Sequence, residues 1–174
     1  LIEAKDLPVA LTWPMADFLP FDHRLNCGRF GVVAKRHPNM ILQKADFVLV
    51  LGSRLDNIQT AFNADRFARQ AKTFVVDIDT AELRKMPEKV TTYHLDLSAL
   101  VPTLSSRLKG SGVPASRRAW LDDIDRIRTK FSRETFAYLG AGDEDELLPL
   151  ALAERLAVVG GLLDAHVRPP EGRV

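Results

Sequence analysis

The chain has 174 residues, of which 46% are hydrophobic and 27% charged, with a net charge of +1. This balance is ordinary for a folded domain and gives no electrostatic reason to expect a nucleic acid or an anionic membrane surface as a partner. No apolar run approaches the roughly 20 residues of a membrane helix, and the lone Cys27 excludes an internal disulfide and a multi-cysteine metal site.

The first residues are acidic where a secretory signal would be basic, and the sequence does not begin with Met. We therefore expect a cytoplasmic protein and interpret the chain as a processed, truncated or excised piece of a longer one.

Residues 7–13 predict a short strand that ends at Thr12 and Trp13, because Pro14 follows. Residues 15–31 contain Pro, Asp, Asn and Gly every few positions, which predicts a long loop. Its Gly28–Gly31 segment reads either as a backbone cradle for a ligand or as a plain structural turn. Residues 39–45 predict a helix.

Residues 47–51, Phe-Val-Leu-Val-Leu, are the most strongly patterned stretch of the chain. A short, wholly apolar run predicts a strand that is buried on both faces, as in a parallel sheet. It ends at Gly52, where the backbone can approach a ligand closely, and is followed by Arg54, whose planar guanidinium suits phosphate or carboxylate. A core strand with Arg54 paired to Asp56 or Asp77 is an equally good interpretation.

The spacing of apolar residues then predicts a helix reaching residue 71, a strand over 73–79 and a short helix from Thr80 to Met86. A strand over 90–95 and a helix over 97–108 follow. Strands that alternate with helices indicate an α/β fold with a parallel sheet and helices on both faces.

Beyond this α/β domain, which we place at residues 1–109, residues 110–114 have the composition of a linker. Apolar residues recur at helical spacing over 115–131, which predicts a core-facing helix. Residues 143–163 are predicted to be helical in part and 168–174 to be unstructured, so that 115–174 forms a helical segment.

Polar groups follow several predicted strands, and parallel strands bring their carboxyl ends to one edge of a sheet. An acid at such an end, such as Asp77, can hold ribose hydroxyls; capping the next helix is about as good a reading. Asp79 and Asp96 fit caps or solvated acids better. No nucleophilic motif or metal-spaced cluster of residues is present, and Cys27 reads as an unreactive thiol.

Several of these segments, in this order, resemble the central domain of thiamine-diphosphate-dependent enzymes, and of acetolactate synthase in particular. The resemblance rests on Gly28–Gly31, on Pro38-Asn39, on residues 45–56, on residues 75–79 with Glu82 and Lys85, and on Asp96 at the start of a helix. It spans roughly residues 7–108.

The resemblance implies a transferase or lyase that makes or breaks carbon–carbon bonds at 2-oxo acids, with thiamine diphosphate and Mg²⁺ held by other domains. It implies a homo-oligomer, a dimer or tetramer, for the full-length enzyme, and in some members FAD or ADP in the central domain. The nucleotide-binding positions that it implies are Thr12, Trp13, Gly31, Gly52, Arg54, Asp77, Ile78 and Asp96.

The chain departs from the family pattern at two places. The opening strand with its Gly-rich turn, expected before Leu1, is missing, which predicts an incomplete sheet. Val32-Val33 replaces the Met-His that often follows the loop glycine in FAD-binding members. The Glu that activates thiamine and the Gly-Asp-Gly metal motif are also missing, so we expect the chain to be inactive alone.

Two other hypotheses fit the same residues. A freestanding NAD- or nucleotide-binding module of sirtuin-like fold accounts for the Gly, Arg and Asp at the strand ends, but lacks zinc cysteines. A purely structural or assembly domain would have an empty crevice. Titration with FAD, ADP and NAD separates the three.

Overall fold

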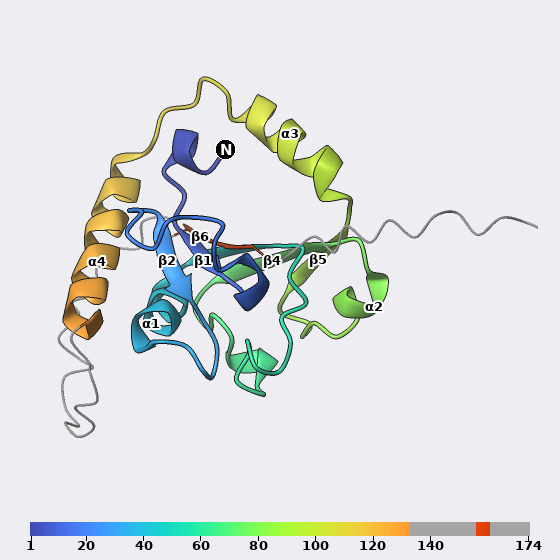
Figure 1. The fold of residues 1–174 in the computed structure, drawn as a ribbon. Coiled ribbons are helices and arrows are strands. Elements are labelled where there is room, and N and C mark those ends of the chain that lie inside the picture. The colour runs from blue at the N-terminus through green and yellow to red at the C-terminus, as the bar shows by residue number, and fades with distance from the viewer. Residues whose placement is uncertain (133–155, 161–174) are drawn as a thin grey trace, which may run out of the picture.

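In a computed structural model, which describes residues 1–132 and 156–160, the chain forms a six-stranded sheet in the order β2-β1-β6-β3-β4-β5 (Figure 1). All neighbouring strands are parallel, which confirms the predicted fold class. The strands are β1 (Val9–Leu11), β2 (Asn26–Arg29), β3 (Phe47–Leu51), β4 (Lys72–Asp77), β5 (Thr91–His94) and β6 (Leu156–Gly160).

Helices lie on both sides of this sheet, with α1 on one side and α3 on the other (Figure 1). The helices are α1 (Arg36–Lys44), α2 (Thr80–Leu83), α3 (Leu97–Arg107) and α4 (Ala115–Ser132), with short 3-10 turns at Glu3–Lys5, Trp13–Met15 and Ala64–Arg66. The helices predicted at 39–45, 80–86, 97–108 and 115–131 are confirmed, with ends shifted by a few residues.

The core lies on the α1 side of the sheet. Val48 and Val50 of β3 are fully buried and belong to one cluster with Ile41 of α1. On the opposite face of β3, Phe47, Leu49 and Leu51 are half-buried, and the Phe47 ring stacks on Phe74 at 5.1 Å between centroids. The prediction that β3 is buried on both faces is therefore confirmed for the face of Val48 and Val50 and wrong for the other face, which is only half-buried.

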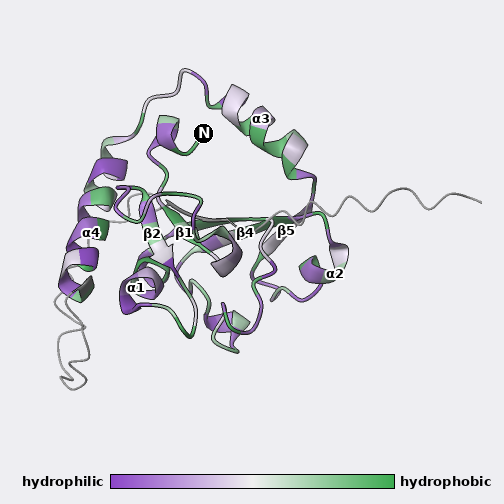
Figure 2. Ribbon diagram, in the orientation of Figure 1, coloured by the Kyte–Doolittle hydropathy of each residue, from purple (hydrophilic) through white to green (hydrophobic). Residues whose placement is uncertain are grey.

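The predicted core-facing helix, α4, is confirmed. Trp120, Ile124, Ile127 and Phe131 recur on one side of it, and each is at most 8% exposed. They join the cluster that holds Val48 and Val50. Figure 2 shows that α4 alternates apolar and polar residues along its length.

The segment predicted as a loop over residues 15–31 contains β2. Its first residue, Asn26, is buried and donates from its side-chain amide to the carbonyls of Leu19 and Pro20 at 3.1 and 3.0 Å. The amide therefore organises the preceding loop and lets a polar residue be buried in this edge strand. This strand of Asn-Cys-Gly-Arg has no β-type pattern that sequence reasoning recognises.

The helix predicted after residue 56 is wrong. Turns occupy this stretch, with one 3-10 turn at Ala64–Arg66. Ala61 and Phe62 have φ of 54° and 58°, in the left-handed region that ends a helix. Asp56 begins the first of these turns, because its Oδ1 accepts hydrogen bonds from the N–H groups of Ile58 and Gln59 at 2.9 Å.

The partly helical segment predicted over 143–163 is a strand at 156–160, where β6 pairs with both β1 and β3. Two ladders of backbone hydrogen bonds outweigh the local periodicity of this stretch. The rest of that range and the tail over 168–174 lie outside the described residues. The domain and linker boundaries at 109 and 114 stay predictions.

We expect Val50→Ala to lower the free energy of unfolding by about 2–3 kcal/mol, because Val50 is 0% exposed and truncation leaves a cavity. Val33→Ala is the matched control: Val33 is 68% exposed, so its truncation should change stability by less than about 0.5 kcal/mol. Chemical denaturation measures both. Equal, small effects would contradict the central position of β3.

A buried histidine lies under β2. His37 of α1 is 6% exposed, and within the described part of the chain its Nδ1 has no hydrogen-bond partner. Burial, followed by the nearby charges of Lys35 and Arg128, lowers the pKa of His37 from 6.5 to about 4. The folded protein therefore holds His37 neutral at pH values where the unfolded chain protonates it.

Between pH 6.5 and about 4 the unfolded state binds the additional proton, so stability falls as the pH falls through this window. The loss from this one group is at most about 3.5 kcal/mol, since the shift is about 2.5 pKa units and one unit corresponds to about 1.4 kcal/mol. We expect His37→Gln to flatten this part of the stability–pH curve measured by urea unfolding. If the stability–pH curves of the unsubstituted protein and of His37→Gln were parallel, His37 would not be the group responsible for the loss of stability.

Candidate functional site

The residues at the carboxyl ends of the strands form one edge of the sheet, which we call the rim. All eight predicted binding residues fall there or in the turns that follow, because every strand runs the same way. They are Thr12 and Trp13 after β1, Gly31 after β2, Gly52 and Arg54 after β3, Asp77 at the end of β4 with Ile78 after it, and Asp96 after β5.

Hydrogen bonds join the ends of β3, β4 and β5. The N–H of Gly52 donates to the Val76 carbonyl at 2.9 Å, and the N–H of Leu95 donates to the Asp77 carbonyl at 3.2 Å. The His94 ring Nε2 is 2.9 Å from the Ile78 carbonyl oxygen. These contacts hold three successive strand ends in a fixed relation to one another.

The other side of the rim contains a cation that sequence reasoning missed. The guanidinium of Arg29, the last residue of β2, lies 4.4 Å from the centroid of the Trp13 ring. Trp13 is 50% exposed, so this pair presents a flat aromatic surface and a positive charge to solvent. The sequence gives only a weak indication that Arg29 belongs to the rim, because the residues of β2 have the composition of a loop.

Gly31 has φ of 118° and is held by Asn39 of α1. The Asn39 amide accepts from the Gly31 N–H and donates to the Gly31 carbonyl, both at 2.9 Å. The N–H of Val32 donates to the Ile58 carbonyl at 2.9 Å, which ties the end of β2 to the turn after β3. The glycine is needed here because a Cβ would lie 2.8 Å from the Ile58 oxygen.

The three acids of the rim have different local tasks. Asp79 caps α2 by accepting from the Ala81 N–H, and Asp96 caps α3 by accepting from the Ser98 N–H at 2.7 Å. That bond from Ser98 lowers the pKa of Asp96. Asp77 is 7% exposed and accepts from the Asp79 N–H at 2.9 Å. Asp77 is therefore not the cap of α2, and Asp79 and Asp96 are caps, as one reading predicted.

Two of the eight predicted residues differ sharply in accessibility. Thr12 is 2% exposed, so Trp13 rather than Thr12 carries the accessible surface at the end of β1. Ile78, in contrast, is 62% exposed and offers an apolar surface beside Asp77.

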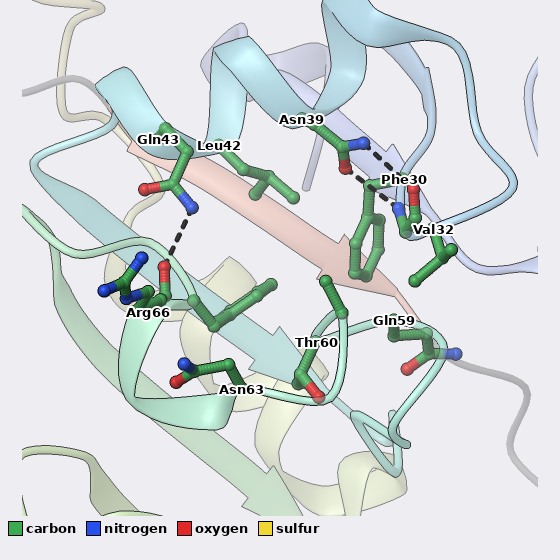
Figure 3. A pocket seen from close by; sticks show the side chains of 12 residues that line it. Phe30, Val32, Asn39, Leu42, Gln43, Gln59, Thr60, Asn63 and Arg66 are labelled. Atoms are coloured by element: carbon green, nitrogen blue, oxygen red, sulfur yellow. Dashed lines mark hydrogen bonds between the residues drawn. The ribbon is translucent and has the colours of Figure 1, made fainter.

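A cavity of about 480 Å³ adjoins the rim between α1 and the turns after β3 (Figure 3). Its wall includes Gly31, but none of the other seven predicted residues. Phe30, Leu42 and Phe67 supply apolar surface, and the Gln43 side chain donates to the Arg66 carbonyl at 2.9 Å across it. The remaining lining residues are Val32, Asn39, Gln59, Thr60, Ala61 and Asn63.

The surroundings of Cys27 keep its thiol unreactive. Its thiol is buried, and burial raises its pKa to about 12, so the reactive thiolate does not form near neutral pH. Over residues 1–132 and 156–160, no three His, Cys, Asp or Glu side chains are grouped to hold a metal ion. Over the same residues no helix has the length and apolar character to cross a membrane.

We expect Gly31→Ala to destabilise the protein by about 1–3 kcal/mol, because alanine would be strained at this φ and would clash with the Ile58 carbonyl. Gly112→Ala is the matched control, since nothing lies within 4 Å of a Cβ at Gly112, and should change stability by less than about 0.5 kcal/mol. Thermal unfolding compares the two. Equal melting temperatures for the two variants would show that the fold does not require a glycine at position 31.

Comparison with known proteins places this architecture in a family. Residues 1–104 match the family described as thiamine pyrophosphate enzyme, central domain. This match covers the strands β1 to β5 and therefore all eight predicted rim residues. It describes the thiamine-enzyme domain, and nothing in it supports a sirtuin-like module.

Acetolactate synthases are among the similar curated proteins. The isozyme 1 large subunit of Escherichia coli is 34% identical over 111 residues, covering 62% of this chain and 20% of that protein. The Lactococcus lactis large subunit is 32% identical, covering 74% and 22%, and the chloroplastic acetolactate synthase 1 of Zea mays is 29% identical, covering 75% and 20%.

The chain thus spans about a fifth of the length of these relatives. The match over most of the sheet, together with the parallel strand order, shows that the chain belongs to the thiamine pyrophosphate enzyme family, as a central domain similar to that of acetolactate synthases.

Proposed function

We propose that this chain serves as the central domain of an acetolactate-synthase-like enzyme, a transferase or lyase that makes or breaks carbon–carbon bonds at 2-oxo acids. The observation that carries the proposal is the family match over residues 1–104, which includes all eight predicted residues of the rim. The relatives' names support the reaction class.

In such an enzyme thiamine diphosphate acts as an electron sink for the carbon beside the carbonyl. The described residues contain no acidic or histidine cluster that fits the Mg²⁺ of its diphosphate. We therefore assign thiamine diphosphate, Mg²⁺ and the catalytic groups to other parts of a homo-oligomeric, cytoplasmic enzyme.

The rim itself suits a nucleotide with a diphosphate, either FAD or ADP. Arg54 and Arg29 supply positive charge for the diphosphate. Trp13 and Ile78 supply exposed apolar surface, and Asp77 supplies a carboxylate for ribose hydroxyls. Gly31 and Gly52 adjoin this surface directly after β2 and β3. Thr12 is a buried neighbour of this surface, and Asp96 is the exposed residue that caps α3 beside it.

Calorimetric titration with ADP, FAD and NAD tests the nucleotide part of the proposal. We expect saturable binding of ADP, with NAD weaker. A clear preference for NAD would favour the sirtuin-like reading, and no saturable binding of any of the three would favour a structural domain with an empty crevice.

A pyruvate-consumption assay with added thiamine diphosphate and Mg²⁺ tests the division of labour. We expect no turnover by the chain alone, because the thiamine-activating Glu and the metal motif of the family are assigned to other domains. Measurable turnover would contradict the assignment of the catalytic groups to other domains.

We expect Arg54→Ala to weaken ADP binding by about 1.5–3 kcal/mol, the usual contribution of a hydrogen bond to a charged group. Arg118→Ala is the control, because Arg118 is an exposed arginine of α4 that is not part of the rim. Calorimetry on both variants measures the difference. An unchanged ADP affinity in Arg54→Ala would remove Arg54 from the site.

A further inference from the structure

The two edges of the sheet are protected to different degrees. β2 forms one edge, where Asn26 and Cys27 are buried and the register with β1 shifts between Val9 and Ala10. Burial and an irregular register of this kind keep an edge strand from pairing with another chain. β5 forms the other edge (Figure 1), and all four of its residues, Thr91–His94, are exposed. Its register with β4 is regular, so β5 presents an open edge.

The outer side of β5 presents the backbone groups of two alternate residues. The N–H of Leu95 donates to the Asp77 carbonyl at the end of β4, so the backbone of Leu95 and of Tyr93 faces β4. Because these groups alternate in direction along a strand, those of Thr92 and His94 face outward. Of the strands that the structure describes, only β4 pairs with β5. Lysine, proline or a bulge usually blocks such an edge, and β5 contains none of them.

A row of aromatic rings ends at this edge. The Phe47 ring of β3 stacks on Phe74 of β4 at 5.1 Å between centroids, and Phe74 stacks on Tyr93 at 6.3 Å. Tyr93 is 46% exposed, and Leu95, two residues further along the same side of the chain, is 45% exposed. The row therefore leaves apolar surface open at the outer edge, where the side chains of one more strand would cover it.

We propose that β5 pairs with the β5 strand of a second copy of this chain, antiparallel and related to it by a two-fold axis at Tyr93. Thr92 of each copy then lies opposite His94 of the other, and their outward N–H and carbonyl groups bond in both directions. The two Tyr93 rings become neighbours and extend the aromatic row into the second sheet. The dimer involves this chain alone and does not depend on nucleotide binding.

The charges that flank β5 favour a second copy as the partner. Lys89 precedes the strand by two residues, and Asp96 follows it by two. Lys89 donates to the backbone carbonyls of Asp65 and Phe67, and Asp96 accepts from the Ser98 N–H, so neither charge meets an opposite charge among the described residues. Antiparallel pairing about Tyr93 brings Lys89 of one copy beside Asp96 of the other, at both ends of the interface.

Sedimentation velocity of the full chain between about 1 μM and about 1 mM tests the proposal, because this range covers weak to moderate association. We expect a reversible monomer–dimer equilibrium. Thr92→Pro removes an outward N–H and no bond to β4, and Tyr93→Lys places two lysines at the axis. Each should raise the dimer dissociation constant by more than about tenfold, a change of about 1.4 kcal/mol. Val33→Lys is the control, because it adds the same charge at a residue that is 68% exposed and lies outside β5.

A cysteine probe tests the geometry of the dimer. Tyr93→Cys places two thiols at the axis, where facing residues of an antiparallel pair come close enough for a disulfide. Cys27 is buried and does not compete. Under mild oxidation we expect a disulfide-linked dimer of Tyr93→Cys, and much less of it for Ser106→Cys, an exposed position of α3.

Three results would overturn the proposal. The first is a chain that stays monomeric up to about 1 mM. The second is a dimer that persists in both Thr92→Pro and Tyr93→Lys. The third is growth beyond a dimer, because the two-fold pairing leaves no β5 edge free. If circular dichroism shows that Thr92→Pro does not fold, Tyr93→Lys and the Tyr93→Cys crosslink decide between the same outcomes.

Discussion

Parallel pairing along β3 is the interaction on which the rest of the structure depends. β3 is paired on both sides, with β4 and with β6, over all five of its residues. The backbone N–H and carbonyl groups of such a strand have no alternative partner once water is excluded. The parallel pairing therefore fixes both the direction and the position of β4 and β6 relative to β3. Because every strand then runs the same way, the polar residues that follow them collect on one edge.

The rim is held by a few contacts that fix its backbone. Asn39 locks Gly31 from α1, and the Gly52 N–H bonds to the end of β4. Asp56, Asp77, Asp79 and Asp96 each accept an N–H two residues further along the chain. The acids thus accept hydrogen bonds from backbone N–H groups that would otherwise lack a protein partner after the strand ends. They thereby fix the backbone of the rim, which carries Arg29 and Arg54.

β6 changes the interpretation of the missing opening strand. The sequence predicts an incomplete sheet, with a gap or an open edge before Leu1. In the structure the position between β1 and β3 is filled by Leu156–Gly160, which pairs with both neighbours in parallel. Without a strand at this position, β1 and β3 would each expose an unpaired ladder, and open edges of this kind are unfavourable. The two halves of the rim are joined through this strand.

The sequence by itself determined the α/β class, the position of β3 and the amphipathic α4, because these depend on local apolar patterns. The eight rim positions were implied by the resemblance to the central domain of thiamine-diphosphate-dependent enzymes. Tertiary structure alone decided β2, β6, the turns after Asp56 and the placement of Arg29 on Trp13. The Asn-Cys-Gly-Arg segment of β2 has no local preference for a sheet, and Leu156–Gly160, although it contains two valines, lies in a stretch whose apolar spacing predicts a helix. Their conformation comes from hydrogen bonds to strands far away in sequence, which local propensity does not register.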